Sequence, residues 1–80
     1  MRATIFTFDQ VFHTRHDVQE NLPLDQALQL ARTRCQDRCE DEQPVREDIE
    51  GKGVTFRNHT DYVEVVRFIG EKEDVEAKAA

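Results

Sequence analysis

Long apolar runs and signal-like segments are the features that this sequence lacks. No stretch of its 80 residues approaches the roughly 20 consecutive apolar residues of a membrane-spanning helix. Residues 1–4 lead directly into a strand-like run, without the apolar core of a signal peptide. We therefore expect a cytoplasmic protein with no membrane segment.

Cysteine is also scarce, because the chain contains only Cys35 and Cys39. In a helix, residues four positions apart have Cβ atoms about 5–6 Å apart, which exceeds the roughly 3.5–4.5 Å that a disulfide requires. We therefore expect two free thiols, as is usual in a reducing compartment.

The chain is too short for more than one domain or for a deep catalytic pocket. A protein of this length buries only about 60% of its unfolded surface. We predict a single domain over residues 1–70, with an acidic connector at 37–50, followed by a charged and frayed tail at 71–80.

Basic residues are few in the connector. Residues 37–50 hold seven acids and two arginines, a net charge of −5, whereas the remaining ten acids and nine bases give −1. A concentrated negative surface acts mainly on association with positively charged partners. The predicted partner-binding residues are Glu40, Asp41, Glu42, Glu47, Asp48 and Glu50. The alternative interpretation is a solvated linker.

Apolar patterning predicts strands at both ends of the domain. Residues 3–12 are rich in β-branched and aromatic side chains and indicate a strand, followed by a turn at 13–16 and a short second strand at 17–21. Residues 54–57 and 62–69 indicate an antiparallel hairpin.

A helix is predicted between these regions. It begins within residues 22–25, because proline is tolerated in a first turn and Asp25 is favoured by the helix dipole. Its apolar stripe consists of Leu24, Ala27, Leu28, Ala31 and Cys35. Burial of each leucine should contribute roughly 1.5–3 kcal/mol, so we expect Leu28 to be a main anchor of the helix on the sheet. Pro44 disfavours helix at the preceding residue and predicts a stop.

The predicted fold is therefore α+β, a small antiparallel sheet with one helix packed on one face, in the order β-β-α-β-β. One helix covers only one face of such a sheet. We expect the other face to carry exposed or partner-covered side chains from among Phe6, Phe8, Phe12, Val66 and Phe68.

His13, His16, Cys35, Cys39 and His59 supply zinc-type ligands, but their spacing does not indicate a metal site. His13 and His16 would converge only in a turn, and Cys35 and Cys39 lack the paired spacing of zinc motifs. Cys35 continues the apolar stripe, which favours a core thiol. The connector acids have neither a cleft nor a calcium-loop pattern. We predict no catalytic residues, no cofactor and no metal, and hence no enzyme.

Nucleic-acid binding would require a basic face. Eight of the eleven basic residues are arginines, but the net charge of −6 argues against direct binding. We expect Arg2, Arg15, Arg57 and Arg67 to pair with Glu64, Asp17 and their neighbours.

Four segments carry a resemblance to a known class of proteins: the strand at 4–8, the helix at 24–31, the acidic stretch after it, and the strand at 62–69. Together they resemble the small phage-encoded anti-CRISPR proteins that act on type I CRISPR systems. The resemblance implies a non-enzymatic inhibitor, a monomer or weak dimer in the host cytoplasm. It would dock on a basic surface of an effector complex and block target DNA binding. The alternative is a small nucleic-acid-binding or regulatory protein that uses the open sheet face.

Overall fold

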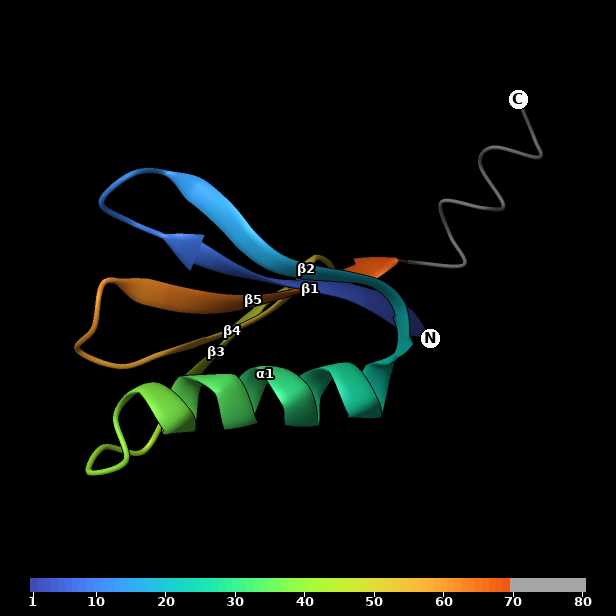
Figure 1. Cartoon of the computed structure of the whole chain (residues 1–80). Helices are drawn as coiled ribbons and strands as arrows, with labels where there is room; N and C mark the ends of the chain where they lie inside the picture. The colour runs from blue at the N-terminus through green and yellow to red at the C-terminus, as the bar shows by residue number, and fades with distance from the viewer. Residues whose placement is uncertain (70–80) are drawn as a thin grey trace, which may run out of the picture.

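A five-stranded antiparallel sheet with a helix against one face makes up residues 1–69, the part of the chain that this computed structural model describes (Figure 1). The elements are β1 (Arg2–Asp9), β2 (Thr14–Pro23), α1 (Leu24–Arg38), β3 (Val45–Ile49), β4 (Gly53–Arg57) and β5 (Tyr62–Ile69). The strand order across the sheet is β2-β1-β5-β4-β3, so the N-terminal and C-terminal hairpins meet at the β1–β5 pair. The predicted α+β class, with one helix on one face, is confirmed.

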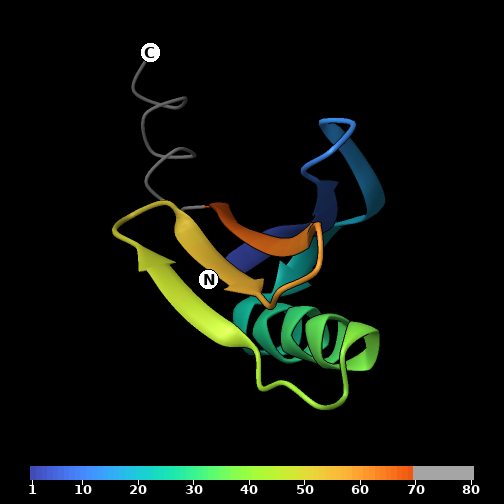
Figure 2. The same ribbon diagram turned by 90° about the vertical axis from the view of Figure 1, so that its left-hand side faces the viewer.

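Strand β3 is an addition to the predicted elements. Its residues pair with β4 from Val45 opposite Arg57 to Ile49 opposite Gly53. All five of its residues are exposed, so no apolar alternation indicates a strand in the sequence. The connector is therefore not a plain linker, because it contains the end of α1, a loop over 39–44 and an edge strand (Figure 2).

The second strand is longer than predicted. The turn lies at residues 10–13 rather than 13–16, and β2 covers ten residues rather than five. Twice along the β1–β2 pair, one residue of β1 lies opposite two residues of β2. Asp17 and Asn21, which lie at these irregularities, have φ angles of 52° and 59°. Asp and Asn tolerate this left-handed conformation better than most residues, and such bulges bend the strand.

The core lies between α1 and the sheet. Its buried members are Ala3, Ile5, Ala27, Ala31, Cys35, Val54, Phe56 and Val66. The predicted stripe of α1 does face the sheet, but its fully buried positions are the small ones. Leu24 and Leu28 are only partly buried at the margin of the core. Leu28 is therefore less buried than expected, because the alanines bring the helix close to the sheet and leave the leucines at its sides.

The prediction for the open face is corrected in part. Val66 and Phe68 belong to the helix side of the sheet. Phe6 does lie on the open face but is only 4% exposed, because the guanidinium groups of Arg15 and Arg67 lie over its ring. Phe12 is 74% exposed in the β1–β2 turn.

The predicted tail at 71–80 lies outside the described residues. Within residues 1–69, the only helix is α1, which is too short and too polar to cross a membrane.

Candidate functional site

The six predicted partner-binding acids lie along one edge of the molecule. Glu40, Asp41 and Glu42 are in the loop between α1 and β3. Glu47 and Asp48 are on β3, and Glu50 begins the turn to β4. All are exposed except Glu42, which is half-buried. Among the described residues, only Glu42 and Asp48 of the six form ion pairs. Glu40, Asp41, Glu47 and Glu50 are therefore exposed and form no ion pair within residues 1–69, and they follow one another along the loop, β3 and the turn after it.

The acids of β3 point to both sides of that edge. Asp48 is opposite Val54 in the register, on the helix side, and Arg46 pairs with it at 3.0 Å. Glu47 is opposite Thr55, on the open side. The acidic surface is a ridge around the edge strand rather than a flat patch.

The loop at 39–44 is held by one side chain of α1. The amide Nε2 of Gln36 donates to the backbone carbonyls of Cys39 at 3.4 Å, Glu40 at 3.1 Å and Glu42 at 3.2 Å. The backbone N–H of Glu42 also donates to the carbonyl of Cys39 at 3.2 Å. These bonds satisfy carbonyls of the segment that follows α1 and fix the path of the acidic loop.

A second loop, between β4 and β5, is tied to the same helix end. The Nδ2 of Asn58 donates to the carbonyl of Cys35 at 2.9 Å, and its Oδ1 accepts from the backbone N–H of Thr60 at 3.0 Å. This turn places the next residue, His59, beside the loop at 39–44.

Cys39, Glu42 and His59 converge where the two loops meet. One ligand atom from each lies within 4.8 Å of the others. The Sγ of Cys39 is 3.8 Å from Nδ1 and 3.9 Å from Nε2 of His59, and the same Nδ1 pairs with Oε2 of Glu42. The backbone N–H of His59 also donates to Oε2 at 3.3 Å. Hydrogen bonds from His59 hold the pKa of Glu42 below its ordinary value.

This cluster was not predicted. Spacing along the chain pairs Cys39 only with Cys35, and His59 lies 20 positions from Cys39. The contact depends on the end of α1 lying beside the β4–β5 link. In the structure both cysteines are free thiols, as expected, and Cys35 is buried. Burial, followed by the nearby carboxylate of Glu64, raises the pKa of the Cys35 thiol.

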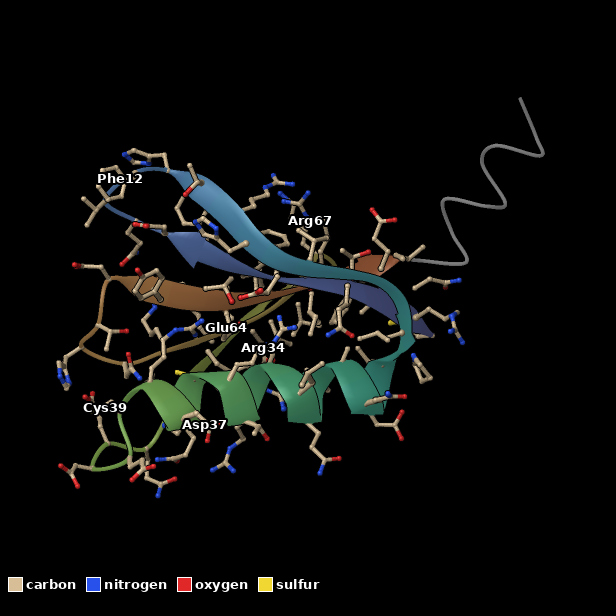
Figure 3. All side chains as sticks on the ribbon, in the orientation of Figure 1. Phe12, Arg34, Asp37, Cys39, Glu64 and Arg67 are labelled. Carbon is tan, nitrogen blue, oxygen red and sulfur yellow. The ribbon has the colours of Figure 1, made fainter. Side chains whose placement is uncertain are left out.

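Glu64 is a buried carboxylate between the sheet and the helix, only 1% exposed (Figure 3). Thr7 donates its hydroxyl to both carboxylate oxygens, at 2.8 and 3.0 Å. Arg38 forms an ion pair with Oε2, and Arg34 lies 3.9 Å from Oε1. A buried charge this well compensated has a structural role. Its partners are arginines of α1, not the sheet arginines that the sequence predicted.

Two of the sheet arginines, Arg15 and Arg67, instead meet on the open face. Arg15 and Arg67 lie 4.6 and 5.7 Å above the ring centroid of Phe6, and Figure 3 places Arg67 on the side of the sheet away from α1. Arg2 donates to the side chain and backbone of Asn21. None of these three, nor Arg57, forms an ion pair within residues 1–69. The expected pairing with Asp17 is also wrong, because the side chain of Asp17 forms no ion pair within residues 1–69. Only its backbone carbonyl contacts an arginine, accepting from Arg34 at 2.9 Å.

No protein-family model, curated protein or solved structure matches this chain.

Proposed function

We propose that this protein is a non-enzymatic binding protein that docks on a basic surface through its acidic edge, defined as the loop at 39–44, strand β3 and Glu50. This proposal rests on Glu40, Asp41, Glu47 and Glu50, which are exposed, lie on one ordered segment and form no ion pair with any residue from 1 to 69. Exposed charges of one sign steer association with a partner of opposite sign.

The ordering of this segment favours recognition over a solvated linker. Pairing with β4 fixes the backbone of β3, and Gln36 fixes the loop. A surface that is already ordered loses less conformational entropy when it binds. Because β3 is at the edge of the sheet, its outer backbone groups are also available to a partner strand.

The specific partner that we propose is a subunit of a type I CRISPR effector complex. Two things support this partner: the resemblance to anti-CRISPR proteins and the match between an acidic edge and a DNA-binding surface, which is basic. Arg15 and Arg67 on the open face make the molecule unlike DNA as a whole. The proposal is therefore a local acidic contact that prevents target DNA from binding.

The test compares two variants of equal net charge. The edge variant carries Glu40→Gln, Asp41→Asn and Glu47→Gln, and the control variant carries Glu20→Gln, Asp25→Asn and Asp61→Asn. Both should remain folded, because exposed charges contribute little to stability. Association with a purified type I effector complex, measured by surface plasmon resonance, should be slower for the edge variant only. The difference should fall with added salt, since exposed charges are screened over roughly 8–10 Å. Equal association rates for the two variants would exclude the acidic edge as the docking surface.

A second candidate function is favoured by the arginines of the open face. Arg15 and Arg67, stacked on Phe6 without an acidic partner in the described part of the chain, offer the guanidinium surface that contacts phosphates and bases. Nearby, a depression of ≈ 340 Å³ includes Lys52 and Arg67.

This candidate predicts salt-sensitive binding of single-stranded DNA. Arg15→Gln with Arg67→Gln should weaken that binding, whereas Arg32→Gln with Arg46→Gln should not. Fluorescence anisotropy at low salt provides the measurement, and an absence of binding by the parent protein would rule the second candidate out.

A further inference from the structure

We propose that Cys39, Glu42 and His59 form a binding site for a divalent transition-metal ion, with Zn²⁺ as the best match. The three side chains come from two loops that meet at the C-terminal end of α1. They supply one sulfur, one nitrogen and one oxygen, which are the three donor types that zinc accepts in proteins.

The spacing of the donor atoms agrees with a shared ion. Zinc bonds of about 2.3 Å to sulfur and about 2.0–2.1 Å to nitrogen place the two atoms about 3.6 Å apart in a tetrahedron. The Sγ of Cys39 and Nδ1 of His59 are 3.8 Å apart. The oxygen of Glu42 already contacts the same Nδ1, and all three ligand atoms lie within 4.8 Å of one another. An ion at Nδ1 would replace that contact with a bond to each donor.

The same geometry argues against a nucleophilic cysteine. A thiol activated by histidine faces one ring nitrogen while the carboxylate holds the other. Here Nδ1 contacts Glu42, and Sγ is nearly equidistant from both nitrogens. The thiol therefore does not face one ring nitrogen alone, as an activated thiol would.

The backbone under the cluster is ordered by bonds that do not involve the ligands' side chains. Gln36 holds the carbonyls of Cys39 and Glu42, and Asn58 ties the turn before His59 to α1. The side chain of His59 is 70% exposed, so the ion would face solvent. Three protein ligands and an open fourth position, filled by water, complete the proposed coordination.

The first experiment uses Zn²⁺ alone with the full chain, stripped of metal by a chelator and freed of the chelator. Competition with a chromogenic zinc indicator should give one ion per chain. With Co²⁺ as a spectroscopic substitute, a thiolate-to-cobalt charge-transfer band should appear. Cys39→Ser should abolish that band. Both Cys39→Ser and His59→Gln should lower zinc affinity at least tenfold, because loss of even a residue that only supports a zinc ligand lowers affinity by about that factor. Glu42→Gln should also weaken binding.

Matched controls replace the same residue types outside the cluster. Cys35→Ala, His16→Gln and Glu40→Gln should leave the zinc stoichiometry and the cobalt band unchanged. Circular dichroism of the metal-free variants checks that each is folded. Failure of the parent protein to bind zinc would overturn the proposal, as would a cobalt spectrum without a thiolate band. Equal zinc affinity in Cys39→Ser and the parent would do the same. The measurement needs no partner, so its outcome is independent of the proposed docking function.

Discussion

At the scale of single residues, burial decides what each acid and each thiol can do. Glu64 and Glu47 are both on strands, yet Glu64 is enclosed by Thr7 and Arg38 while Glu47 faces solvent. The sequence did not distinguish them, because both faces of residues 62–69 mix apolar and charged side chains. The arginines that compensate Glu64 lie on α1 and reach it only in the folded chain.

The two thiols should differ sharply in reactivity. Cys35 is 2% exposed, and burial raises its pKa, so little thiolate forms in the native protein. A thiol reagent at mildly alkaline pH should therefore label Cys39 quickly and Cys35 only after denaturation. Cys39→Ser should remove the fast phase. Rapid labelling of both thiols in the folded parent would show that Cys35 is not enclosed in the core.

The raised pKa of Cys35 also gives the sign of a pH effect on stability. A thiol whose pKa is higher in the folded state than in the unfolded state stabilises the fold fully below the unfolded pKa. That contribution is lost as the pH rises through the folded pKa. Unfolding should therefore become easier in the alkaline range, and less so in Cys35→Ala.

At the scale of elements, the sequence predicted the helix and the strands that have a buried face. It predicted the exposed strand β2 only in part and did not predict β3. The helical stripe from Leu24 to Cys35 and the strands at 54–57 and 62–69 were predicted within a few residues. β3 has no buried residue, and its conformation comes from pairing with β4. The contact of Cys39 with His59 was likewise invisible, because only tertiary structure joins positions 20 residues apart.

Two glycines with different roles lie where β3 turns into β4: Gly51 is in the turn, and Gly53 is the first residue of β4. A Cβ on Gly53 would lie 1.9 Å from the backbone oxygen of Val66, so any side chain would push β4 away from β5. Gly51 has a φ of +74° but open space around it. Its replacement is therefore strained without a clash.

Gly53→Ala should consequently lower the melting temperature far more than Gly51→Ala. The expected loss for Gly51→Ala is about 1 kcal/mol, the usual cost of a left-handed conformation for a residue with a Cβ. Thermal unfolding followed by circular dichroism measures both. A larger loss for Gly51→Ala would mean that β4 does not approach β5 as closely as described.

At the scale of the whole molecule, charges of opposite sign are separated. Carboxylates line the edge formed by β3 and the preceding loop, whereas Arg15 and Arg67 lie on the open face. The net charge of −6 conceals this separation. Because of that net charge, the sequence predicted ion pairs between the sheet arginines and acids that they do not contact. The two proposed binding modes use separate surfaces, so each can be tested without altering the other.

The stability of the whole chain depends on the centre of the sheet, where β1 joins the N-terminal hairpin to β5. Ile5 is 1% exposed, faces α1 and is opposite Val66. Ile5→Ala should lower the free energy of unfolding by about 2–5 kcal/mol. A domain of this size has a stability of only about 5 kcal/mol, so much of the population should be unfolded near 37 °C.

Leu28→Ala provides the internal comparison, because Leu28 is partly exposed at the margin of the same core. Leu28→Ala should lower the free energy of unfolding clearly less than Ile5→Ala does. Ile49 is 40% exposed, so Ile49→Ala should change the free energy of unfolding by no more than about 0.5 kcal/mol. Urea unfolding of the three variants gives the order. If Leu28→Ala proved the most damaging, α1 would be anchored by its leucines after all. The close approach of its alanines to the sheet would then not be the main source of stability.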